Sequence, residues 1–211
     1  MEHLDRGSPA AGPDDCAALA ARIALWENAL RSGESSRADV VASLTDSIGS
    51  PCGRDVALLQ VAFGRQAALL AAESDARWQA ARRAGLAPFA PGGARASIAW
   101  AGGSPADAAR VDAFVGDLVA GHSDIRPDPA RMRRGIDLLV AVTRAADAGR
   151  RAQAHSMIAW LQWAGGRPAE ADRHVGYALE AEPGHVFARL LRGMFRSGWR
   201  PHWLIDTPVT A

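Results

Sequence analysis

Apolar residues recur along most of this 211-residue chain at the three- and four-residue spacing of an amphipathic helix. The clearest case follows Ser104-Pro105, where a capping serine and a proline precede an apolar stripe that runs from Val111 to Val119. Similar stripes cover residues 14–31, 37–48, 54–84 and 128–148. Alternation at period two with hairpin turn residues is absent from the sequence. The pattern predicts an all-α protein, a helical bundle or array of about eight or nine helices.

Glycine, proline and aspartate mark where these helices begin and end. Gly33 is a stop signal for the first helix, and Gly64 is a candidate break within residues 54–84. Asp128-Pro129 begins a later helix, which Gly149 is expected to end. The buried face of that helix is predicted to consist of Ile136, Leu139, Val140 and Thr143.

Residues 154–198 predict a helical hairpin followed by a third helix. An apolar helix ends at Gly165-Gly166, and a second helix begins at Pro168. Small or turn residues match positions of a tetratricopeptide repeat at Gly166, Ala171, Ala178 and Pro183. The tryptophan and tyrosine positions of that repeat are unmatched, and only one full repeat fits. We therefore expect tetratricopeptide-like helical hairpins inside a helical domain, not an array.

The sequence around the turn of this hairpin is similar to a segment earlier in the chain. Residues 163–171 (WAGGRPAEA) are similar to residues 100–108 (WAGGSPADA). An internal repeat of a helical hairpin indicates solenoid-like stacking, and a chance likeness in an alanine- and glycine-rich chain is the alternative.

The density of glycine and proline also divides the chain. The predicted division is a disordered N-terminus at 1–12, an N-terminal helical region at 13–85, a linker at 86–97, a C-terminal tetratricopeptide-like helical region at 98–198 and a tail at 199–211.

Composition narrows the functional classes. All 24 basic residues are arginine, which excludes Schiff-base lysine chemistry and a P-loop lysine. A formal net charge of +1 provides no global field that attracts nucleic acid or an anionic membrane. The N-terminal residues lack a secretory pattern, and no stretch is apolar enough to span a bilayer. We expect a cytoplasmic protein that does not bind membranes.

Residue types that carry catalysis do not form a known motif here. Cys16 and Cys52 are too few for a disulfide framework or a cysteine zinc site, and we expect two reduced thiols. His155, His174 and His185 lack the spacing of a zinc site and are expected to be surface or capping residues. The sequence therefore predicts no catalytic residue, no metal and no cofactor, and a protein that is not an enzyme.

Tryptophan is the most distinctive candidate for binding, with seven residues in the chain. Trp160 and Trp163 are neighbours on one helix face, and they form the candidate partner-binding surface together with Trp199 and Trp203. The alternative interpretation is that the first pair packs against an adjacent helix and that the tail tryptophans dock back onto it.

A basic patch is the second candidate. It consists of Arg131, Arg133, Arg134, Arg150 and Arg151. Nearby aspartates reduce the net positive charge of this patch, and the sequence contains no known nucleic-acid-binding motif. Nucleic-acid binding is therefore a minor alternative.

The C-terminal half also resembles a known family. The residues that carry the resemblance are 126–131, 134–139, 157–163, 166–167, 178–185 and 201–203. They are similar to the C-terminal helical part of the actinobacterial family numbered domain of unknown function 4192 (DUF4192), well over residues 124–204 and more loosely over 14–60. Members are usually longer, with an N-terminal portion that this chain is expected to lack. The resemblance implies an actinobacterial, cytoplasmic helical domain and assigns no catalytic residue.

These observations predict a non-enzymatic helical domain with a protein-interaction or regulatory function and an unidentified protein partner. One alternative is the helical portion of an enzyme whose catalytic part is absent from this chain. A second alternative is nucleic-acid binding through the arginines at 131–151.

Overall fold

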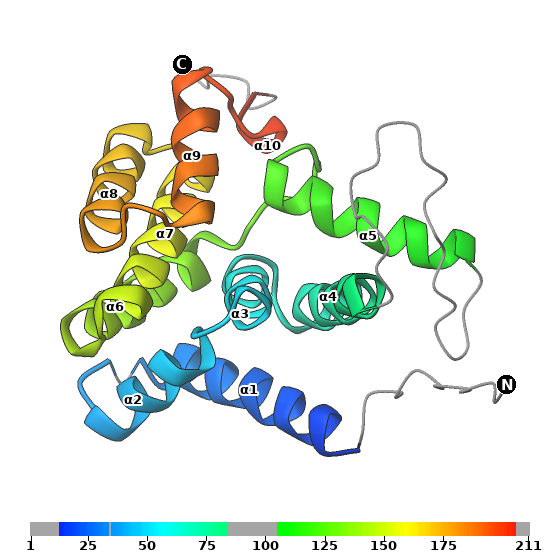
Figure 1. The fold of residues 1–211 in the computed structure, drawn as a ribbon. Coiled ribbons are helices and arrows are strands. Elements are labelled where there is room, and N and C mark those ends of the chain that lie inside the picture. Colours follow the sequence, from blue (N-terminus) through cyan, green and yellow to red (C-terminus); the bar gives the residue numbers. More distant parts are fainter. Residues whose placement is uncertain (1–12, 34, 84–104, 206–211) are drawn as a thin grey trace, which may run out of the picture.

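Helices are the only regular elements in the described part of the chain, which confirms the predicted all-α class (Figure 1). The computed structural model describes residues 13–33, 35–83 and 105–205. The helices are α1 Pro13–Ser32, α2 Ala38–Ser47, α3 Pro51–Phe63, α4 Arg65–Arg83, α5 Pro105–Ala120, α6 Pro129–Ala145, α7 Ala148–Ala164, α8 Pro168–Ala181, α9 Val186–Arg196 and α10 His202–Ile205. The single turn α10 was not indicated by the pattern. The predicted disordered residues 1–12 and linker 86–97 lie outside the described residues.

Several predicted helix boundaries are confirmed. The Asp128 side chain accepts hydrogen bonds from the backbone N–H groups of Ala130 and Arg131 at the start of α6. Gly64 has a φ of 88° and separates α3 from α4. Gly166 has a φ of 75° in the turn between α7 and α8. Glycine is favoured at both turns because other residues rarely adopt such angles.

The predicted end of α6 at Gly149 is wrong. α6 ends at Ala145, and Gly149 lies in the first turn of α7. The Asp147 side chain accepts a hydrogen bond from the N–H of Arg150 and so caps the start of α7. This capping aspartate decides the boundary, because it satisfies a backbone donor that a new helix leaves free.

The predicted buried face of α6 is confirmed only in part: Leu139 is buried, and Ile136 and Val140 pack against the core. Ile136, Val140 and Thr143 are only half-buried. The buried positions are Met132, Gly135, Leu138, Leu139 and Val142. Gly135 contributes no apolar side chain, so the sequence pattern does not reveal that this face approaches Val61 of α3 closely.

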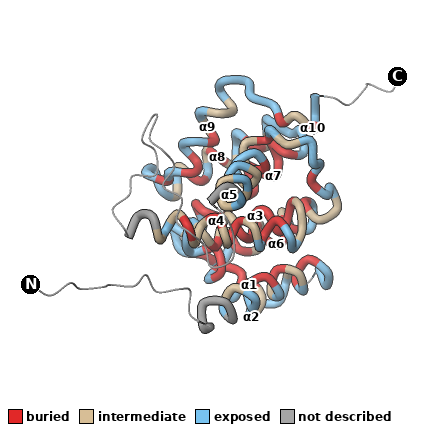
Figure 2. Tube along the Cα trace, turned by 90° about the vertical axis from the view of Figure 1, so that its right-hand side faces the viewer, coloured by how far each residue is buried: buried red, intermediate tan, exposed pale blue. Residues whose placement is uncertain are grey.

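α7 is the central helix of the C-terminal group. Every residue from Ala152 to Ala164 is buried except the half-buried His155. α7 contacts α3, α6, α8 and α9, and Figure 2 shows burial concentrated on α3 and α7. A helix that is apolar around its circumference is stable in water only when others cover it.

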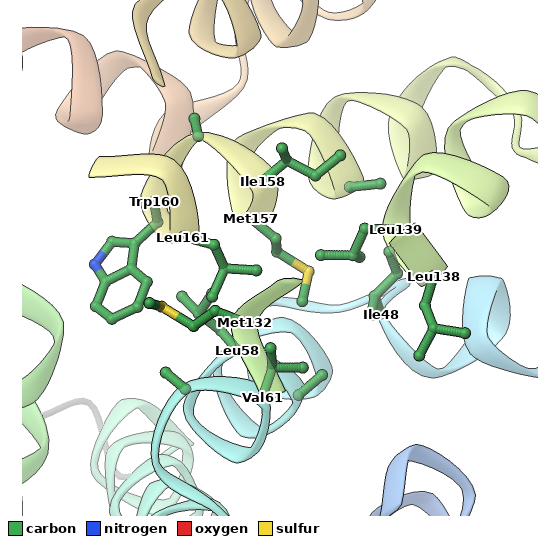
Figure 3. Packing of buried hydrophobic residues seen from close by; sticks show 14 of the residues in the cluster. Ile48, Leu58, Val61, Met132, Leu138, Leu139, Met157, Ile158, Trp160 and Leu161 are labelled. Atoms are coloured by element: carbon green, nitrogen blue, oxygen red, sulfur yellow. The ribbon is translucent and has the colours of Figure 1, made fainter. Parts of the chain in front are cut away.

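One hydrophobic core joins the helices on both sides of residues 86–97. Its side chains come from α1, α2, α3, α6, α7, α8, α9 and α10. Figure 3 shows Leu58 and Val61 of α3, Met132 of α6 and Met157 of α7 directed toward one another. A smaller cluster around Leu118 packs α5 against α3 and α4. These contacts fix α3 between the two halves of the chain.

An ion pair at the edge of this core ties α1 to α6. The Arg131 guanidinium donates to both carboxylate oxygens of Glu27, at 3.0 and 2.9 Å, and to the backbone oxygen of Gln60 in α3. Hydrogen bonding from Arg131 lowers the pKa of Glu27 from its ordinary value. The two-pronged geometry sets the position of α1 relative to α6.

We predict that Gly135→Ala destabilises the protein by about 1–3 kcal/mol. A methyl group at this position would lie 2.3 Å from Cγ1 of Val61, which is fully buried and has no room to move away. The matched control is Gly176→Ala in α8, where an added methyl group meets open space. Alanine there is expected to stabilise the helix by about 0.5–1 kcal/mol. Urea unfolding measures both changes, and equal effects would contradict the close contact.

Candidate functional site

Three of the four candidate tryptophans lie inside the fold. The exposed fraction of the side chain is 0% for Trp160 and 3% for both Trp163 and Trp203, and only Trp199 is exposed, at 40%. Trp160, Trp163 and Trp203 contact one another with ring centroids 5.9–6.5 Å apart. In this structure the first three present no surface to a partner.

The indole N–H groups of Trp160 and Trp203 bind carbonyl oxygens at helix ends. Trp160 donates to Val119 in the last turn of α5, at 2.8 Å. Trp203 donates to Ala164, the last residue of α7, at 2.9 Å. The last carbonyls of a helix have no partner within it, so these bonds satisfy groups that would otherwise be buried without one.

The segment after α9 therefore docks back onto the body of the protein. The indole of Trp163 donates to the backbone oxygen of Trp199 at 3.0 Å, and the N–H of His202 donates to Gly121 at 2.7 Å. Gly121 has a φ of 75°, and a methyl group there would lie 2.6 Å from Trp163 and 3.0 Å from Cα of Pro201. This is the alternative interpretation of the tryptophans, in which they hold the chain together.

The arginines of the basic patch do not act together on one surface. Arg131 binds Glu27, and Arg150 pairs with Asp147. Arg151 donates to backbone oxygens at the end of α6, of which that of Ala146 lies 2.9 Å away. Of this patch, only Arg133 and Arg134 have neither an ion pair nor a side-chain hydrogen bond among the described residues. Three of the five candidate residues thus have structural partners.

The three histidines have separate environments. Nδ1 of His155 and Nδ1 of His174 lie 3.0 Å apart between α7 and α8, so one ring donates and the other accepts. Burial, the neighbouring His174 and Arg151 lower the pKa of His155 to about 4, and burial also lowers the pKa of His174. His185 caps α9 by accepting from the N–H of Ala188.

Groups suited to metal or thiol chemistry are not assembled in the described part of the chain. No cluster of three or more histidine, cysteine, aspartate or glutamate side chains there is arranged to hold a metal. Burial and the nearby Asp75 carboxylate raise the pKa of the Cys52 thiol to about 12, which keeps it protonated. The side chain of Cys16 lies outside the described residues.

A hollow of about 270 Å³ lies where α3, α7 and α9 begin. It is lined by twelve residues that include Arg54, Arg150, Gln153, Glu182 and His185. This mixture resembles an active site, but His185, Gln153 and Arg54 are bonded within the protein, and Arg150 pairs with Asp147 through a terminal nitrogen. His185 and Gln153 are hydrogen-bonded at 2.6 Å, and Arg54 pairs with Asp55 at 2.7 Å. The hollow is therefore a polar junction between helices.

A second hollow is larger and was not indicated by the sequence. The α8–α9 groove has a volume of about 450 Å³ and is lined by Leu179, Pro183, Arg189, Arg192, Gly193 and Arg196. The three arginines follow one another at spacings of three and four residues, so they lie along one side of α9. The spacing of these arginines can be read from the sequence. The orientation of α9, which places them on a groove, cannot.

Two aliphatic side chains on α9 face solvent. The exposed fraction is 71% for Val186 and 65% for Leu190, whereas Phe187, Ala188 and Leu191 are buried in the core. No described helix is both long and apolar enough to cross a membrane. The outer surface of α9 therefore combines an apolar strip with the arginines of the α8–α9 groove.

We predict that Trp203→Phe destabilises the fold by about 1–3 kcal/mol, because the buried carbonyl of Ala164 loses its donor. The matched control is Trp199→Phe, which also removes an indole bond, to Ala120 at 2.9 Å, but at an exposed position that water can reach. The control should change the free energy of unfolding by less than about 0.5 kcal/mol. Chemical denaturation measures both, and equal losses would argue against the buried bond.

The His155 pair predicts a pH dependence of stability. The folded pKa of about 4 lies below the ordinary value of 6.5, so the unfolded chain binds the proton more readily. Stability is fully present above about pH 6.5 and falls as the pH drops toward 4. Because the ring is half-buried and partly screened, the loss attributable to His155 is on the order of 1 kcal/mol.

His155→Gln should remove that part of the dependence. The measurement is the free energy of unfolding at several pH values between about 7 and 4.5, for the wild type and the variant. Parallel curves for the two proteins would show that His155 does not titrate differently on folding.

Comparison with known proteins identifies the family. No curated protein and no solved structure matches the chain. A family described as "Domain of unknown function (DUF4192)" matches residues 5–202, a wider part of the chain than the residues 124–204 and 14–60 that carried the resemblance. The actinobacterial source and the tetratricopeptide-like character of the α7–α8 hairpin stay predictions. Because the match covers nearly all of the chain, this protein belongs to the DUF4192 family.

Proposed function

We propose that this protein is a non-enzymatic interaction domain that binds a protein partner on the outer surface of α9. The observation that carries the proposal is the exposure of Val186 and Leu190, at 71% and 65%. They are one helical turn apart and form a continuous apolar strip. An exposed apolar strip beside a concave hollow is typical of a surface that docks a helix or an extended peptide.

The two alternatives have weaker support. Nucleic-acid binding through residues 131–151 needs a continuous basic surface, and Arg131, Arg150 and Arg151 are held by partners within the chain. A catalytic role for the hollow beside His185 needs groups free to react, and both ring nitrogens of that histidine have hydrogen-bond partners. By contrast, Val186 and Leu190 on α9 are largely exposed and are not covered by other parts of the fold.

We predict that Leu190→Asp abolishes partner binding without unfolding the protein. The charged side chain interrupts the apolar strip at an exposed position, so the fold tolerates it while an apolar partner does not. The measurement is quantitative affinity capture from cells that produce the protein naturally, followed by binding of the purified partner. Its affinity for the variant should be at least about tenfold lower than for the wild type.

Ile125→Asp is the matched control. Ile125 is also aliphatic and 49% exposed, but it lies between α5 and α6 and is not part of the α9 surface. The control should bind the partner as the wild type does, and circular dichroism checks that both variants fold. A partner that binds all three proteins equally would exclude the α9 surface, and capture of nothing above the resin background would count against an interaction domain.

A further inference from the structure

Several arginines of the fold pair with carboxylates. The three that line the α8–α9 groove do not, and neither do Arg133 and Arg134 on α6. Arg77 pairs with Glu73 and Asp112, and Arg173 pairs with Glu170. No carboxylate of the described residues forms an ion pair with Arg189, Arg192 or Arg196. The three positive charges follow one another along one side of α9, where they repel one another. A bound anionic group would relieve that repulsion.

The lining of the groove also indicates what kind of anion fits. Its remaining residues are Leu179, Pro183 and Gly193, and none of the six lining residues is acidic. An added methyl group at Gly193 would meet open space, so a bound chain can approach the α9 backbone there. The volume of about 450 Å³ suits a few side chains and is too small for a nucleic-acid duplex.

The surroundings of the groove favour a peptide over other anions. Val186 and Leu190 provide apolar contacts on the same helix, which a phosphate backbone would not use. The aromatic residues of α9 cannot stack on bases or enter a bilayer, because Phe187 is buried and Phe195 packs on the Trp163 ring. Arginine binds carboxylates through two parallel hydrogen bonds, which gives both affinity and direction.

We infer that the α8–α9 groove binds an acidic segment of the partner protein, one that alternates carboxylates with aliphatic side chains. Its carboxylates would pair with Arg189, Arg192 and Arg196, and its aliphatic side chains would lie on Val186 and Leu190. This inference rests on the proposed interaction function and specifies the chemistry of the segment that is bound.

The test uses synthetic peptides and the full chain. A capped peptide of sequence EELEELEE and its neutral counterpart QQLQQLQQ are titrated into isotopically labelled protein, and backbone and arginine Nε–H resonances are followed by NMR. The acidic peptide should shift resonances of α8 and α9, and its affinity should fall as sodium chloride is raised from about 50 to 300 mM. The neutral peptide should bind at least about fivefold more weakly.

Matched variants locate the interaction. Arg192→Gln should weaken binding of the acidic peptide roughly fivefold, whereas Arg133→Gln, an exposed arginine of α6, should leave it unchanged. Equal binding of the two peptides, or equal effects of the two variants, would overturn the inference. So would tighter binding of a thymidine oligonucleotide or of phosphatidylglycerol vesicles to the same residues.

These outcomes are separable from failure of the proposed function. If a captured partner depends on Leu190 but the acidic peptide does not bind at millimolar concentration, the interaction function stands and the acidic segment is excluded. If the acidic peptide binds through Arg192 but no partner is captured, the groove chemistry stands and the interaction function loses its support.

Discussion

Helix α7 is buried around its whole circumference from Ala152 to Ala164, apart from His155, and the surrounding helices are arranged to cover it. Such a helix cannot leave any side in water, so α3, α6, α8 and α9 must pack on it from different directions. Ser156 in this helix donates to the Gln153 carbonyl at 2.7 Å, and the Gln153 side chain bonds His185 at 2.6 Å. Because α9 places Phe187 and Leu191 in this core, its opposite side is turned to solvent.

Tryptophan serves this arrangement in two ways. The rings of Trp160, Trp163 and Trp203 fill the space between α7 and the segment after α9, and their N–H groups bind carbonyl oxygens. A purely apolar side chain would fill the same volume and leave the carbonyl groups at the ends of α5 and α7 buried without donors. Tryptophan is common at binding surfaces. In this chain it instead donates hydrogen bonds to carbonyl groups that the ends of its own helices leave free.

Several arginines likewise bind groups that the packing of the helices would leave without a partner. Arginines at helix contacts hold carboxylates or carbonyl groups, as Arg131 does with Glu27 and Gln60. The arginines of the α8–α9 groove contact no carboxylate of the described residues and stand beside exposed aliphatic side chains. Groups whose hydrogen-bonding capacity is not used by the fold are the ones available to a ligand. The functional proposals concern α9 because its unpaired arginines also line a hollow.

Local physical chemistry allowed much of the fold to be predicted from the sequence. The start of α6 at Asp128-Pro129 and the turn at Gly166 depend on capping and backbone angles within a few residues, so the sequence alone determined them. The inward face of α6 depended on the approach of Val61 to Gly135, residues 74 positions apart in the chain (135 − 61). The orientation of α9 and the burial of the tryptophans likewise depended on distant helices. Only the tertiary structure decided these, because a side chain is exposed or buried by what packs against it.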